Sequence, residues 1–105
     1  MREIRLGREA RADLIEIASY LIEQTEETSL GRRFLVAFEE TVRLLARYPQ
    51  MGREIDFGDG VRARSFVVRR FHRYRIFYED RVSVLRVIRV LHGARDVDSI
   101  LTDTE

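Results

Sequence analysis

The sequence predicts an α+β fold of the order β-α-α-β-β-β, with a two-helix hairpin packed on one face of a small antiparallel sheet. Apolar residues recur at helical spacing between residues 10 and 45, and a two-residue alternation replaces that spacing from residue 61 onward. Residues 49–60, rich in proline and glycine, separate the two patterns. A chain of 105 residues with 45% hydrophobic content is expected to form one domain over residues 1–97, followed by an acidic C-terminal tail at residues 98–105.

The first strand and both helices are expected in the N-terminal half. Residues 2–6 alternate polar and apolar side chains, as a short edge strand does, and Gly7 follows at a suitable N-cap position. The polar run 23–29 then connects two helices. The second helix ends near Arg47, because Pro49 biases the residue before it away from helical conformation. The two apolar stripes are Ala10, Leu14, Ile17 and Leu21, and then Phe34, Phe38, Thr41 and Leu45.

The C-terminal half is expected to form three strands after a loop at residues 49–60. The strands cover residues 61–68, 74–79 and 82–91, and the last two are antiparallel neighbours because Asp80-Arg81 between them allows only a tight hairpin. One face of such a sheet packs under the helices, and the other is left to solvent or a partner. Strict alternation would place Val82, Val84, Arg86, Ile88 and Val90 on one face of the last strand, and Ser83, Leu85, Val87, Arg89 and Leu91 on the other.

Composition argues against several classes of protein. The chain has no cysteine and only two histidines, so a disulfide framework is excluded and a structural zinc site is not expected. A glycine-rich phosphate loop, a nucleophile elbow and a metal-binding helix pair are all absent from the sequence. We therefore expect no metal and no cofactor. No apolar run is long enough to span a membrane and the N-terminus lacks the apolar core of a signal peptide, so a cytoplasmic protein is expected.

Charge is segregated along the chain, although the formal net charge is only +1. Residues 61–96 carry ten arginines and three acids, a net +7, whereas residues 1–60 and 97–105 each carry a net −3. Such a basic sheet suits an anionic partner, either nucleic acid or an acidic protein segment, and arginine favours bidentate contacts. The alternative is a solvated face on which arginine stems cover apolar surface. The absence of lysine also fits the codon composition of a GC-rich genome.

His92 is the candidate for acid-base chemistry. It ends the last strand, and Arg95 and Asp96 follow within four residues, so the three could act as proton-transfer group, anion-binding cation and orienting acid. A ribonuclease would also need a base for the 2′-hydroxyl, and Glu79 or Asp96 could supply it. The structural alternative is that these residues hold the C-terminal turn together. His72, beside Arg73 at the start of a strand, is expected to be a surface group.

An ordered set of motifs over residues 2–97 resembles the ParE branch of the RelE/ParE toxin superfamily. The motifs are Ala10-x-x-Asp13-Leu14-x-Glu16-Ile17-x-x-Tyr20, Tyr48-Pro49-x-x-Gly52-Arg53, Gly60-Val61-Arg62, His72-Arg73-Tyr74-Arg75-Ile76-Phe77-Tyr78 and Arg89-Val90-Leu91-His92-Gly93-Ala94-Arg95-Asp96. The resemblance implies a type II toxin, of the kind associated with plasmid maintenance and stress responses. It also implies a small ParD-like antitoxin, usually a ribbon-helix-helix protein, and a possible toxin–antitoxin hetero-oligomer.

The two branches of the superfamily imply different mechanisms. ParE-type toxins are associated with poisoning DNA gyrase, whereas RelE-type relatives cleave messenger RNA on the ribosome. The chain has no lysine and its ending departs from the ribonuclease pattern, which favours the ParE mechanism, with no catalytic residue. In the ribonuclease alternative the catalytic candidates are His92, Arg86, Arg89 and Glu79. A third alternative is an inactive nucleic-acid or protein interaction module.

The surface expected to meet the antitoxin or the target lies on the basic strands. A one-sided sheet with a net charge of +7 over residues 61–96 suits an acidic, initially disordered antitoxin segment that folds as it binds. The candidate partner-facing residues are Arg62, Arg64, Tyr74, Arg75, Arg86, Arg89, His92 and Arg95.

Overall fold

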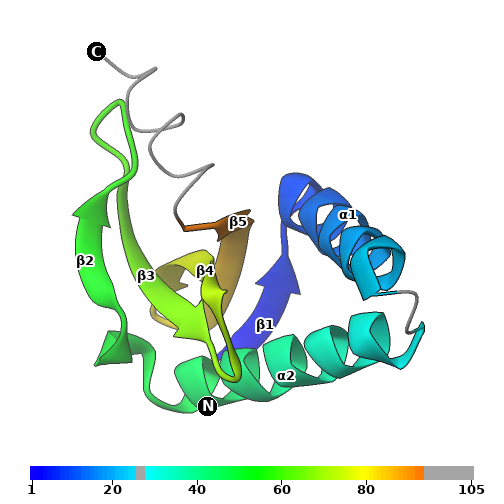
Figure 1. Cartoon of the computed structure of the whole chain (residues 1–105). Helices are drawn as coiled ribbons and strands as arrows, with labels where there is room; N and C mark the ends of the chain where they lie inside the picture. Colours follow the sequence, from blue (N-terminus) through cyan, green and yellow to red (C-terminus); the bar gives the residue numbers. More distant parts are fainter. Residues whose placement is uncertain (26–27, 94–105) are drawn as a thin grey trace.

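The fold combines two helices with a five-stranded sheet, and it confirms the predicted α+β class (Figure 1). The computed structural model describes residues 1–25 and 28–93. The elements are β1 (Glu3–Leu6), α1 (Arg8–Thr25), α2 (Thr28–Arg47), a short 3₁₀ helix η1 (Pro49–Met51), β2 (Arg53–Asp56), β3 (Arg62–Val68), β4 (Phe71–Arg81) and β5 (Val84–His92). The expected tail at residues 98–105 lies outside the described residues, as do Arg95 and Asp96. No helix in the described ranges is both long and apolar enough to cross a membrane.

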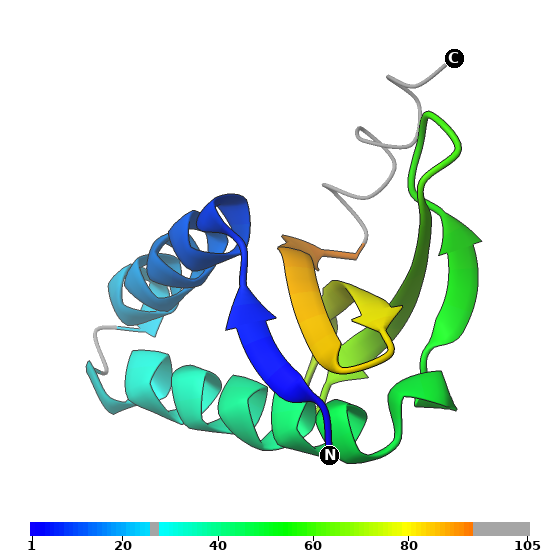
Figure 2. The same cartoon turned by 180° about the vertical axis from the view of Figure 1, so that it is seen from behind.

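The sheet has the order β1-β5-β4-β3-β2 and is mixed. β2, β3, β4 and β5 pair antiparallel, as expected for the C-terminal half, but β1 pairs with β5 in parallel, from Glu3 opposite Val84 to Leu6 opposite Val87. Two parallel strands can be neighbours only if a long segment of chain connects them. Between β1 and β5 this segment contains both α-helices and the strands β2, β3 and β4. Figure 2 shows β1 beside β5 from behind.

The expected loop at residues 49–60 contains regular structure. Pro49 opens the short helix η1, and β2 follows it and pairs with β3, with Ile55 opposite Ala63. β2 has only four residues, and three of them are charged, so it lacks the apolar alternation that reveals a strand. The interpretation of this region as loop was therefore wrong at residues 53–56.

The β4–β5 hairpin is confirmed, but its turn lies two residues later than predicted. β4 continues through Asp80-Arg81, and the turn is formed by Val82 and Ser83, with Val82 at a φ of 57°. The pairing also shifts register: Phe77 lies opposite Arg89 and Tyr78 opposite Val87, which makes Ile88 an extra residue on β5.

The bulge at Ile88 reverses the alternation along β5. Val90 joins Leu85 and Val87 in the core, whereas Arg89 and Leu91 face the other way. The strict alternation expected over residues 82–91 is wrong beyond residue 88, because one inserted residue exchanges the faces of all that follow.

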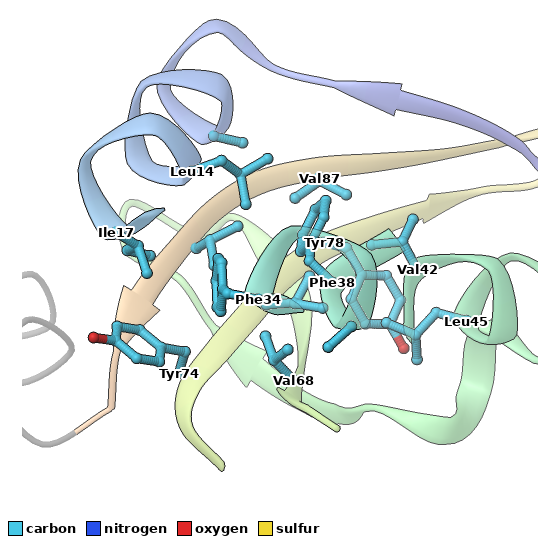
Figure 3. Packing of buried hydrophobic residues seen from close by; sticks show 14 of the residues in the cluster. Leu14, Ile17, Phe34, Phe38, Val42, Leu45, Val68, Tyr74, Tyr78 and Val87 are labelled. Carbon is cyan, nitrogen blue, oxygen red and sulfur yellow. The ribbon is translucent and has the colours of Figure 1, made fainter. Parts of the chain in front are cut away.

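The main core lies between the helices and the inner face of the sheet, defined as the face toward α1 and α2 (Figure 3). Both predicted helical stripes contribute to it, and Phe34 stands at its centre with edge-to-face contacts, 5.4 Å between centroids, to Phe71 and Tyr74. Its buried members are Ala10, Leu14, Ile17, Phe34, Ala37, Phe38, Val42, Leu45, Val68, Tyr74, Ile76, Tyr78, Leu85, Val87 and Val90. This core fixes the strands on which the candidate residues lie.

Tyr78 connects the core to η1 through its phenol group. Its side chain is fully buried, its hydroxyl donates to the Pro49 carbonyl at 2.6 Å, and it accepts the Gly52 N–H at 3.0 Å. Burial raises the pKa of the phenol above its ordinary value, and the hydrogen bond from Gly52 only partly offsets this effect.

Stability is expected to fall in alkaline solution because of Tyr78. The unfolded chain ionises this tyrosine near pH 10, whereas the folded chain holds the proton to higher pH. The stabilising contribution is therefore complete below about pH 10 and is lost as the pH rises toward the folded pKa. Urea unfolding between about pH 9 and 11 checks this expectation, and Tyr78→Phe is the reference, since it keeps the other tyrosines. Equal pH slopes for both chains would contradict the assignment to Tyr78.

Candidate functional site

The partner-facing residues predicted from the sequence are divided between the two faces of the sheet. Arg64 lies opposite Tyr78, and Tyr74 lies opposite His92, so these residues belong with the inner face. Arg75 lies opposite both Val67 and Leu91, on the face away from the helices, which we call the outer face. Arg62, Arg64, Tyr74 and His92 thus share the inner side of their strands, and Arg75, Arg86 and Arg89 share the outer side. The strands do not gather the set into one surface.

Arg89 is bound inside the fold. Its Nε and Nη2 donate to the two carboxylate oxygens of Asp13 on α1, at 2.8 and 2.9 Å, and Glu9 lies 3.3 Å from Nη1. Asp13 also accepts the backbone N–H of Val90 at 2.9 Å. β1 ends at Leu6, which pairs with Val87, so no residue of β1 can accept the Val90 N–H. The Asp13 carboxylate accepts it instead. Arg89 therefore joins α1 to the sheet.

Glu79 and Arg86 pair with each other near the turn of the β4–β5 hairpin. Arg86 Nη1 lies 3.1 Å from Glu79 Oε1, and Arg81 reaches the same carboxylate at 3.3 Å. His92 lies six residues farther along β5, about 20 Å away at the rise of an extended strand. The four ribonuclease candidates therefore do not converge on one point: two form a pair at one end, Arg89 is held by Asp13, and His92 ends the strand.

Arg64 serves η1. Its Nη1 donates to the Gly52 carbonyl at 2.8 Å, and its Nη2 lies 3.2 Å from Glu54. Arg62, at the start of β3, is exposed. Arg64 is therefore held by contacts within the chain, whereas the side chain of Arg62 is exposed.

The outer face carries a small apolar group bordered by arginine. Phe77 and Leu91 are nearly inaccessible, and the ring of Phe57 lies 5.2 Å from that of Phe77. Arg75 Nε donates to the Ser65 hydroxyl at 2.7 Å in the middle of this face. Burial lowers the pKa of the Arg75 guanidinium, and the positive charge of Arg53 on β2 lowers it further. The positive charges of Arg53 and Arg75 lie beside this apolar group. Such a surface has the chemistry to bind a carboxylate that has apolar side chains next to it.

A cavity of about 830 Å³ opens between the C-terminal end of α1, the first residues of β4 and the last residue of β5. It contains both histidines, and the ring of His92 lies edge-to-face on Tyr74 at 5.4 Å. The described residues that line it are Tyr20, Leu21, Gln24, Arg70, Phe71, His72, Arg73, Tyr74 and His92. His72 was expected to be a surface group, and its side chain is exposed. The hairpin pairing, with Tyr74 opposite His92, brings it to this site. No cluster of three or more His, Asp or Glu that could hold a metal occurs within residues 1–25 and 28–93.

Comparison with known proteins identifies the family. A family model described as the ParE toxin of type II toxin-antitoxin systems matches residues 4–97, which include both helices and every strand residue except Glu3. A search of curated proteins found no match. The match spans most of the chain and contains the sheet, hairpin and C-terminal histidine motifs described above. The chain belongs to the ParE toxin family of type II toxin-antitoxin systems.

Proposed function

We propose that this toxin binds DNA gyrase in the cytoplasm, blocks DNA replication, and is neutralised by direct binding of a ParD-like antitoxin. Membership of the ParE toxin family supports the toxin role. The observation that favours binding over RNA cleavage is the placement of the four ribonuclease candidates. General acid-base catalysis requires its groups within hydrogen-bond reach of one substrate. Glu79 and Arg86 instead pair with each other, and Arg89 pairs with Asp13.

Induction of the toxin without its antitoxin is expected to stop DNA synthesis before protein synthesis. Pulse-labelling of growing bacteria with thymidine and with an amino acid measures the order of the two effects. A gyrase poison also leaves cleaved DNA, so the DNA-damage response should rise, and purified gyrase should accumulate cleaved plasmid when the chain is added. Earlier loss of amino-acid incorporation would instead support the ribonuclease alternative, and no effect on either would support the interaction module.

We place the antitoxin on the outer face. The half-buried apolar side chains of this face, Phe57 and Val67, would receive apolar side chains of the antitoxin, and Arg53 and Arg75 would pair with its acids. An acidic segment that is disordered before binding would order along this face, while the ribbon-helix-helix part would lie outside it. The expected product is a toxin–antitoxin hetero-oligomer.

Charge reversal at Arg75 is expected to weaken antitoxin binding by at least about tenfold, because it places a carboxylate against acidic side chains. Arg75→Glu and, as control, Arg47→Glu on the exposed end of α2 are titrated with the proposed ParD-like antitoxin. Calorimetry at two salt concentrations measures the affinity. The difference between the two variants should shrink at high salt. Equal affinities for both variants at low salt would overturn the placement. Arg89 is unsuitable for this test, because its reversal would also break the contact with Asp13.

A further inference from the structure

The cavity at the end of α1 has the composition of an anion site with an aromatic wall. Its volume, about 830 Å³, lies within the range of pockets that hold small organic ligands. Two arginines and two histidines line it, together with Tyr20, and no acidic residue occurs among the described lining residues.

We propose that this cavity binds a nucleotide, with the phosphate held by Arg73, Arg70 and His72 and the base placed against Tyr20 and His92. The inference goes beyond the proposed function, since binding of a nucleotide here neither requires nor excludes binding of gyrase.

The phosphate side of the site comes from the β3–β4 turn. Arg70, His72 and Arg73 are exposed within four residues of chain, so three nitrogen-bearing side chains border one opening. Arginine matches the geometry of phosphate with two parallel hydrogen bonds. Arg70 lies 3.8 Å from Glu40, but both side chains are largely exposed. An exposed pair of this kind contributes little, so Arg70 can turn toward a phosphate.

The base side of the site is aromatic and rigid. Tyr74 is nearly inaccessible and packs edge-on against Phe34 in the core, and its hydroxyl points away from the core in Figure 3. The His92 ring rests on Tyr74 and therefore has a fixed support. Tyr20, with 39% of its surface exposed, borders the same cavity from α1. Stacking on such rings binds any nucleobase without strong preference, which suits a nucleotide better than a bare anion.

The test titrates the purified full chain with adenosine 5′-monophosphate, adenosine and inorganic phosphate, each in a separate calorimetric and NMR experiment. We expect the nucleotide to bind more tightly than either part, with amide shifts concentrated at residues 20–24, 70–74 and 92. Arg73→Ala is expected to weaken nucleotide binding about tenfold, because it removes a charge-assisted contact to phosphate. The matched control, Arg47→Ala, removes an exposed arginine at the far end of α2 and should leave the affinity unchanged.

Three results would overturn the proposal: no saturable binding at millimolar nucleotide, amide shifts centred on another surface, or equal losses in Arg73→Ala and Arg47→Ala. Phosphate binding as tight as that of the nucleotide would overturn the assignment of the base. A 5′-phosphorylated oligothymidylate distinguishes the sources of the ligand. Tighter binding than the mononucleotide, with the same amide shifts, identifies a single strand as the source, and equal binding identifies the free nucleotide. Matched thermal melts show that Arg73→Ala is folded, and the gyrase assay is scored independently of all these outcomes.

Discussion

Replacing Asp13 by alanine is expected to lower the free energy of unfolding by about 3 kcal/mol. The carboxylate is nearly buried and accepts three hydrogen bonds, two from Arg89 and one from the Val90 N–H. Alanine would leave a half-buried guanidinium without its main counter-charge and a buried backbone donor without an acceptor. Removal of one partner of a buried pair costs about 3 to 5 kcal/mol, and the 25% exposure of the Arg89 side chain puts this case at the lower end.

Urea unfolding at pH 7, followed by circular dichroism, measures the loss. Asp13→Asn is the informative partner variant, because it can still accept from Val90 but removes the charge that faces Arg89. It should fall between the native chain and Asp13→Ala. Glu9→Ala, at the exposed contact of the same arginine, should change stability by less than about 0.5 kcal/mol. If Asp13→Ala loses no more than Glu9→Ala, the carboxylate does not hold α1 to the sheet.

The role of Asp13 affects how toxin variants are interpreted. Arg89 is a candidate residue for RNA cleavage, so loss of toxicity in an Arg89 variant would suggest catalysis. The same variant would also release Asp13 and the edge of β5. Only variants with unchanged unfolding curves can therefore assign a function to Arg89.

The helices were predictable because their signal is local. The stripe beginning at Phe34 and ending at Leu45 recurs over three turns, and its residues are buried in the core. The strands β3 and β4 were also visible, since alternation and β-branched or aromatic residues coincide. Both α-helices and the hairpin follow from patterns within one segment.

Features that depend on distant pairing could not be predicted in the same way. The parallel contact of β1 with β5 joins residues about 80 positions apart, as Glu3 and Val84 show. The bulge at Ile88 leaves no mark in the composition of β5, although it decides which face Val90 and Arg89 occupy. Period alone assigns a residue to a face only while the register is unbroken.

The dependence on pairing between distant residues also decides which features of the candidate site could be predicted from the sequence. The sequence indicates basic strands, and the structure places Arg75 on the outer face with Arg53 nearby. It does not indicate that Arg64 binds Gly52, or that His72 and His92 border one cavity. Those facts arise from contacts across strands, which no motif in one strand records.

Gly52→Ala is expected to destabilise the fold by about 3 kcal/mol, through a clash with Tyr78. Gly52 has φ −73° and ψ 149°, a conformation that alanine adopts freely, so the backbone itself does not require glycine. An added Cβ would lie 2.9 Å from both Cε1 and Cζ of Tyr78, and closer still to the hydroxyl oxygen. Tyr78 is fully buried, so its ring can yield only by giving up its hydrogen bonds to Gly52 and Pro49.

Urea unfolding of Gly52→Ala, Tyr78→Phe and the double variant separates the clash from a general intolerance of this turn. Removal of the hydroxyl relieves the closest contact, so the loss in the double variant should be smaller than the sum of the two single losses. Gly93→Ala is the matched control, because its Cβ would meet the Arg73 carbonyl oxygen at an ordinary 3.5 Å. It should leave stability unchanged or raise it slightly, as glycine replacement does where the backbone permits. Additive losses at Gly52 and Tyr78 would mean that η1 is held by contacts other than the phenol.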